Sequence, residues 1–143
     1  MVSKTFEQIL RFHEFQTPKG SLWLPLITVE LIYGEGNRLA IPMIFDTGAT
    51  TTTLRAEFAP FLGAATWTEG EPVSVATAGG EFTAYKFAAR LEVLGKVLEC
   101  PVYLQELPPS SFYHGLLGRE AVFQHFGFGF WERDHELLIT ASP

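Results

Sequence analysis

Apolar and polar residues alternate along most of the chain, which is the pattern of β-strands that bury one face. The segment 22–33 shows it most clearly, because alternate side chains of a strand point to opposite faces of a sheet. One face holds Trp23, Ile27, Val29, Leu31 and Tyr33, and the other holds Thr28 and Glu30. A glycine-rich turn at 34–37 and a second apolar segment at 38–45 follow. The first part of the chain is therefore predicted to be a hairpin.

Similar alternation predicts strands at 71–77, 81–94 and 97–104, and a last hairpin over 127–140 that turns near Asp134. The pair Gly79–Gly80 separates the first two of these strands and is suited to a tight reversal, since glycine adopts positive φ at little cost. Two segments differ. A helical turn is expected before Gly63, and apolar residues at helical spacing predict a short helix over 119–126, with Gly127 at its end.

Composition narrows the class of protein. A chain of 143 residues corresponds to one domain, and the hydrophobic share of 47% with thirteen phenylalanines supplies a core. No apolar run reaches about 18 residues, so no membrane segment is expected. The net charge of -6 argues against a nucleic-acid partner, which requires clustered Lys and Arg. The single cysteine, Cys100, excludes an internal disulfide, and we expect a cytoplasmic setting, with a periplasmic one as the alternative.

The motif that carries chemistry is IFDTGAT at 44–50. It places the carboxylate of Asp46 directly after an apolar strand, where a charge without a role is costly. Small residues and a threonine run follow, as a tight turn requires. A second apolar–apolar–glycine element, Leu116-Leu117-Gly118, arrives about seventy residues later, within GLLGRE. Together the two elements are more specific than Asp-Thr-Gly alone.

With the intervening hairpin and the final hairpin, these motifs make the chain similar to the retroviral-type (retropepsin-like) aspartic proteases, as a single-domain cellular or bacterial member. The resemblance extends from about Leu22 to Thr140. It implies an N-terminal extension over 1–20 and a protease domain over 21–143. It also implies an all-β fold, a retropepsin-like closed β-barrel (the acid protease fold) with one short C-terminal helix.

The resemblance also implies an activity, that of an aspartic endopeptidase acting on polypeptides without a metal or organic cofactor. Asp46 would be the catalytic acid and base, Thr47 and Gly48 would build its loop, and Ala49 would help to place the peptide. A mobile flap would be formed by Thr77, Ala78, Gly79 and Gly80. Support beneath the Asp46 loop would come from Leu116, Leu117, Gly118 and Arg119.

Such chemistry needs two carboxylates. At a separation of about 3 Å they cannot both ionise, so they share one proton and act as a pair. The sequence holds one Asp-Thr-Gly and no Asp-Ser-Gly, so the second carboxylate is expected to be Asp46 of another copy in a two-fold homodimer. One departure stands out. The retroviral enzymes place an acidic residue where this chain has Thr50, so Arg119 is expected to find a different partner, such as an acidic residue of the other copy.

Plainer interpretations remain. Asp46 could be a turn residue that caps the backbone locally. The fold could also serve without catalysis, as a peptide-binding or dimerisation module. The histidines His114, His125 and His135 share no metal-ligand spacing, so no metal site is expected. Cys100 lies in an apolar segment before a proline, which favours a buried structural thiol.

Overall fold

The protein is built from β-strands. A computed structural model describes residues 6–108 and 112–141. Its strands are β1 (Gln8–Arg11), β2 (His13–Thr17), β3 (Gly20–Leu24), β4 (Leu26–Tyr33), β5 (Asn37–Phe45), β6 (Thr52–Arg55), β7 (Glu71–Thr77), β8 (Gly80–Phe87), β9 (Arg90–Val93), β10 (Lys96–Glu99), β11 (Val102–Gln105), β12 (Gly115–Leu117), β13 (Phe126–Trp131) and β14 (Glu136–Ala141). Short 3-10 helices are η1 (Ala56–Leu62), η2 (Trp67–Glu69) and η3 (Glu132–Asp134). None of the helices in the described ranges is long and apolar enough to cross a bilayer.

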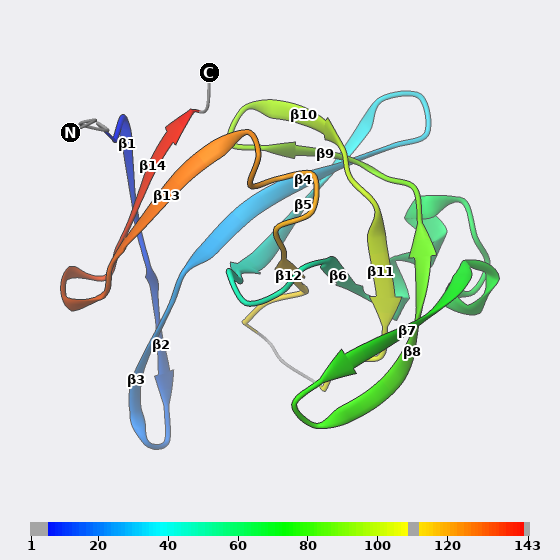
Figure 1. The fold of residues 1–143 in the computed structure, drawn as a ribbon, viewed down its shortest axis with the longest axis horizontal. Helices are drawn as coiled ribbons and strands as arrows, with labels where there is room; N and C mark the ends of the chain where they lie inside the picture. Colours follow the sequence, from blue (N-terminus) through cyan, green and yellow to red (C-terminus); the bar gives the residue numbers. More distant parts are fainter. Residues whose placement is uncertain (1–5, 109–111, 142–143) are drawn as a thin grey trace.

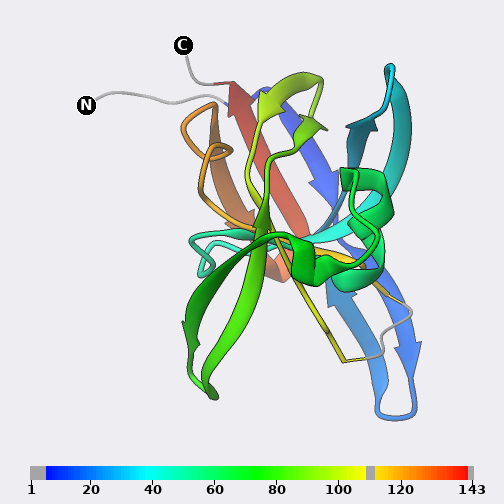
Figure 2. The ribbon, with the colours of Figure 1, turned by 90° about the vertical axis from the view of Figure 1, so that its right-hand side faces the viewer.

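The central element is a nine-stranded sheet in the order β10-β9-β4-β5-β12-β6-β11-β8-β7. It curls around the core, as the two views show (Figures 1 and 2). Its end strands, β10 and β7, are not neighbours in the strand order, so the curled sheet is a half-barrel. A three-stranded sheet, β1-β14-β13, carries both ends of the described chain. This architecture confirms the expected all-β acid protease fold.

The core lies inside the curl and is filled by alternate residues of the long strands, as the sequence pattern predicts. Among its completely or almost completely buried side chains are Val29, Leu31, Ile41, Met43, Leu54, Leu91 and Leu104. Burying a side chain of this kind stabilises the fold by roughly 1.5–3 kcal/mol. An aromatic cluster joins the two sheets, because the Phe45 ring stacks on Phe123 at 4.9 Å and packs on Phe128 at 4.3 Å. Phe45 immediately precedes Asp46.

Three of the predicted strands are interrupted. The segment 22–33 is divided at Pro25, the segment 81–94 at Ala88 and Ala89, and the segment 97–104 at Cys100 and Pro101. The last two breaks face each other, since the Cys100 N–H donates to the Ala89 carbonyl at 2.9 Å. On one side of this bend the chain pairs with β4, and on the other side β8 and β11 pair with each other. The strands therefore divide where the sheet turns a corner.

The helix predicted over 119–126 is wrong in its regular form. The segment is a hydrogen-bonded turn, in which Val122 and Phe123 donate their N–H groups to the Arg119 carbonyl at 3.2 and 3.0 Å. Ala121 has a φ of 62°, a left-handed conformation that a right-handed helix cannot contain. Val122 is still fully buried. The apolar spacing thus predicted the burial of this segment correctly, but it predicted the wrong backbone conformation. The turn expected before Gly63 is confirmed as η1, which ends at Gly63 with φ 82°.

The first twenty residues, which the resemblance set apart from the protease domain, contribute strands to the fold. Strand β1 pairs antiparallel with β14, with Gln8 opposite Ile139 and Arg11 opposite Glu136. Strand β2 pairs with β3 in a separate two-stranded ribbon, with His13 opposite Leu24. We call this ribbon, His13–Leu24, the arm.

Candidate active site

The Asp46 loop connects β5 to β6 and is held by a strand that arrives much later in the chain. β12 lies between β5 and β6, parallel to β5 with Leu117 opposite Phe45, and antiparallel to β6 with Gly115 opposite Leu54. The Asp46 N–H donates to the Leu117 carbonyl at 3.0 Å. The two motifs of the sequence are therefore brought together, with Leu116 and Leu117 beside the strand that leads to Asp46.

Within the loop, backbone and side chain bond to each other. The Gly48 N–H donates to Asp46 Oδ1 at 3.0 Å, and the Ala49 N–H donates to the Asp46 carbonyl at 3.3 Å. Asp46 is half-buried, while Thr47 and Gly48 are exposed. These bonds fix the carboxylate at the surface end of a buried strand. They are also the local bonds that a simple turn-capping role would require, so the loop conformation is compatible with either role.

Gly118 and its neighbours form the base of the loop. The Arg119 N–H donates to the Ala49 carbonyl at 3.0 Å, and the Glu120 N–H donates to the Thr50 carbonyl at 2.8 Å. A side chain on Gly118 would overlap the Thr51 carbonyl, whose carbon lies only 2.5 Å from where a Cβ would stand. Only glycine fits there, because the two backbones approach so closely.

Arg119 contacts Thr50 itself. Its Nη2 donates to Thr50 Oγ1 at 3.4 Å, at an exposed position. The sequence led us to expect a partner for Arg119 elsewhere, such as an acidic residue of another copy. In this structure its side chain instead bonds to the residue at position 50, within the same loop.

A cavity of about 340 Å³ lies between the loop and the β7–β8 hairpin. It is lined by Gly48, Ala49, Thr50, Thr51, Val73, Ser74, Val75, Ala76 and Tyr103. The hairpin turns where the sequence predicted, with Thr77 opposite Gly80 and Gly80 at a φ of 121°. Thr77 Oγ1 donates to the Gly80 carbonyl at 3.0 Å and accepts from the Gly79 N–H at 3.3 Å. The hairpin's strand β7 lines this cavity, and its exposed tip over 77–80 stands beyond it.

Sequence reasoning missed Tyr103. This residue of β11 is 7% exposed and contributes to the lining of the cavity. Burial, together with the nearby carboxylate of Glu120, raises the pKa of Tyr103. Its hydroxyl therefore stays protonated well above neutral pH and keeps its hydrogen to donate. The available signal was its place in an apolar strand, where a tyrosine tends to keep a polar partner for its hydroxyl.

In the described ranges, no group of three His, Cys, Asp or Glu residues could hold a metal ion. Cys100 is buried, its Sγ lies 3.6 Å from the Pro101 carbonyl, and burial raises the pKa of its thiol. These facts agree with a structural thiol.

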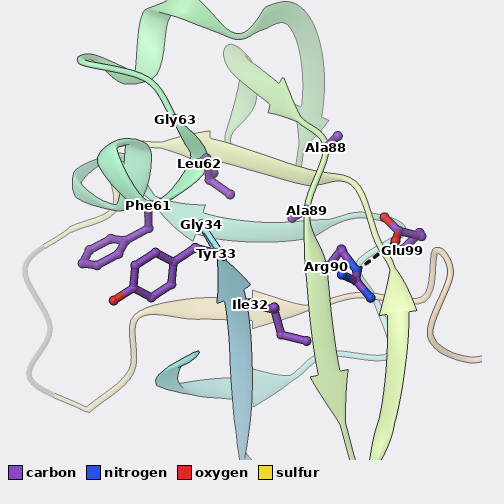
Figure 3. A pocket seen from close by; sticks show the side chains of 10 residues that line it. All are labelled: Ile32, Tyr33, Gly34, Phe61, Leu62, Gly63, Ala88, Ala89, Arg90 and Glu99. Carbon is purple, nitrogen blue, oxygen red and sulfur yellow. Dashed lines mark ion pairs between the residues drawn. The ribbon is translucent and has the colours of Figure 1, made fainter. Parts of the chain in front are cut away.

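Another cavity of about 340 Å³ lies between η1 and the start of β9 (Figure 3). The rings of Tyr33 and Phe61 meet edge to face at 5.1 Å on one side of it, and the Arg90–Glu99 ion pair, at 3.1 Å, lies on the other (Figure 3). It shares no lining residue with the Asp46 loop.

Comparison with known proteins bears on the same segments. Residues 29–121 match a family model described as aspartyl protease. This match covers most of the chain and includes the Asp46 loop, the β7–β8 hairpin and β12. No curated protein matches the chain. By this family match and by its all-β fold, the chain belongs to the retropepsin-like aspartyl protease family.

Proposed function

We propose that this protein is an aspartic endopeptidase that hydrolyses peptide bonds as a homodimer. The observation that carries the proposal is the placement of Asp46. It begins a loop fixed from below by β12, and this loop borders a cavity beneath the β7–β8 hairpin. A carboxylate held in this way, next to space for a peptide, is what water activation requires.

The chemistry needs one more carboxylate, and the sequence holds no second Asp-Thr-Gly and no Asp-Ser-Gly to supply it. Its only other aspartate is Asp134, which lies in η3 at the exposed turn between β13 and β14. The second carboxylate is therefore Asp46 of a second copy, related by a two-fold axis between the loops. The exposed Thr47 hydroxyl would hydrogen-bond across this axis.

In the dimer the two carboxyl groups share one proton. The ionised Asp46 removes a proton from a water molecule as its oxygen attacks the peptide carbonyl carbon. The protonated Asp46 donates a hydrogen bond, then its proton, to the carbonyl oxygen. We expect cleavage to be fastest at mildly acidic pH, because the mechanism needs one proton on the pair. No metal or organic cofactor takes part.

The peptide would lie extended in the cavity, bound through its backbone, with alternate side chains in contact with the apolar residues of β7. Ala49 would help to place it. Thr77, Ala78, Gly79 and Gly80 would form a flap that closes over it and excludes water. Leu116, Leu117, Gly118 and Arg119 would hold the loop geometry. A buried single thiol suits a reducing compartment such as the cytoplasm.

The direct test is Asp46→Asn. This change keeps the shape of the side chain and removes its charge, so we expect cleavage of unstructured polypeptides to be abolished while the circular dichroism spectrum and the dimer are retained. Asp134→Asn is the matched control and should cleave as wild type does. Equal cleavage by wild type and Asp46→Asn would refute the mechanism. Retention of uncut peptide by the wild type would instead identify a peptide-binding module.

A further inference from the structure

The arm is an exposed two-stranded ribbon. In both views it projects beyond the body of the protein, toward the same side as the β7–β8 hairpin (Figures 1 and 2). Most of its residues are exposed, including Leu22 at 38% and Trp23 at 36%. A two-stranded hairpin standing alone in water is at best marginally stable, because it buries little apolar surface. This geometry is expected of an element that packs against something else.

The contacts of the arm with its own chain include two aromatic pairs. On one face the Phe15 ring packs on Phe112 at 4.5 Å, and on the other the Trp23 ring stacks on His135 at 4.2 Å. The Phe12 N–H, just before the arm, donates to the His135 carbonyl at 2.8 Å. Toward the tip the bonds are internal to the ribbon, as between Thr17 Oγ1 and the Gly20 carbonyl at 2.7 Å.

The base of the arm lies beside β5, the strand that leads to Asp46. β3 ends at Leu24, and the carbonyl of the next residue, Pro25, accepts a hydrogen bond of 2.9 Å from the Phe45 N–H. From there β4 pairs with β5, with Leu26 opposite Ile44. The base of the arm is therefore paired with the residues that immediately precede Asp46. In the chain, the arm ends more than twenty residues before Asp46.

We propose that the arm packs on a second copy of this chain and that the partner's arm packs reciprocally on this one. The inference rests on the proposed homodimer, in which the Asp46 loops of two copies meet at a two-fold axis. Elements rooted beside Asp46 then lie next to the partner. A two-fold interface uses the same surface patch on both subunits. Each exposed apolar side chain of the arm is therefore buried in both copies. The arm would thus join the two halves of the active centre.

The first experiment removes the arm at its base. His13 and Leu24 are opposite each other in the ribbon, so replacing residues 14–23 with Asn-Gly closes it by a two-residue turn. Dimer dissociation constants are measured by sedimentation equilibrium in an Asp46→Asn background, where no cleavage can occur. We expect the dissociation constant of the dimer to rise at least about tenfold, which is the size of effect that loss of central interface contacts produces. Near-ultraviolet circular dichroism confirms that the shortened chain is folded.

A point variant avoids the loss of the two aromatic contacts. Leu22→Lys places a charge on the arm at an apolar position, and Val97→Lys makes the same kind of change on β10, where the side chain is 44% exposed. We expect Leu22→Lys to weaken the dimer by about tenfold or more. Val97→Lys should leave the dissociation constant unchanged, since β10 is not part of the arm.

The outcomes separate this inference from the proposed activity. If the dimer is unaffected by both the deletion and Leu22→Lys, the role of the arm is refuted, even if the wild type cleaves peptides. The same conclusion follows if Val97→Lys weakens the dimer as much as Leu22→Lys does, or if the wild type is a monomer at all concentrations. If the arm governs dimerisation and no peptide is ever cut, the inference stands and the endopeptidase proposal fails.

Discussion

The backbone N–H of Gly118 donates a buried hydrogen bond of 3.1 Å to the hydroxyl of Thr52. Gly118 follows β12, and Thr52 is the first residue of β6, so the bond joins the two segments that enclose the end of the Asp46 loop. The loop therefore depends on a side chain outside the Asp-Thr-Gly motif.

Replacing Thr52 by valine keeps the volume and leaves the Gly118 N–H buried without its acceptor. An unsatisfied buried donor costs about 1–3 kcal/mol, so the free energy of unfolding should fall by that amount. Urea denaturation measures it. Thr53→Val, an equally isosteric change one residue later, is the control, because no hydrogen bond of the Thr53 hydroxyl is found in the described ranges. A loss no larger for Thr52→Val than for Thr53→Val would contradict the proposed importance of the bond.

Gly118→Ala tests the close approach of the two backbones. The added methyl group would overlap the Thr51 carbonyl, so we expect a destabilisation of about 1–3 kcal/mol, as overpacking of a filled interior produces. Gly79→Ala is the matched control, because its nearest neighbour would be Thr77 Oγ1 at 3.8 Å. Thermal unfolding of both variants decides the matter, and similar melting temperatures would show that the loop base can relax.

Thr50→Asp should convert the hydrogen bond from Arg119 into an ion pair. The two side chains are exposed, so the gain in the free energy of unfolding should be small, about 0.2–1 kcal/mol, and it should diminish at high salt. Thr50→Asn, which adds no charge, is the comparison. A gain that is equal for both variants, or unchanged by salt, would show that the charge does not contribute.

Stability should fall at alkaline pH. Burial raises the pKa of Cys100 above its ordinary value of 9.0, and burial with the Glu120 carboxylate raises the pKa of Tyr103 above 10.0. The unfolded chain therefore loses these protons first and binds fewer of them than the folded chain. The free energy of unfolding is accordingly undiminished below about pH 9 and declines as the pH rises beyond it. Urea titrations from pH 7 to 11 should show a shallower decline for a Cys100→Ala, Tyr103→Phe double variant, and an identical slope would refute this cause.

Much of the architecture follows from the sequence, because alternating apolar and polar residues indicate a strand and the face that it buries. The strand before the Asp46 loop and the last hairpin lie where period two predicted them, and the chain reverses at Gly79–Gly80 as the glycine pair indicated. Strand β6, which follows the loop, was not predicted. The association of the loop with Leu116-Leu117-Gly118 was reachable through the family resemblance. Both are consequences of local patterns that a single chain displays.

Other features arise only from tertiary context. The alternation of apolar and polar residues does not indicate where a strand changes the strand that it pairs with. The bend at Ala89 and Cys100 was therefore not predicted. Apolar spacing at 119–126 fits a helix and a compact turn alike, and the left-handed Ala121 selects the turn. Tyr103 reaches the cavity because β11 lies between β6 and β8, a strand order that no short motif encodes.

The insertion of β12 between β5 and β6 has a consequence for biosynthesis. While the ribosome is still adding the residues before position 115, Asp46 has already been made but the strand that supports it does not exist. The parallel pairing of β12 with β5 joins residues that are far apart in the sequence. Contacts of such high sequence separation form slowly. A nascent polypeptide of this protein thus cannot complete the support of its acidic loop until β12 has left the ribosome.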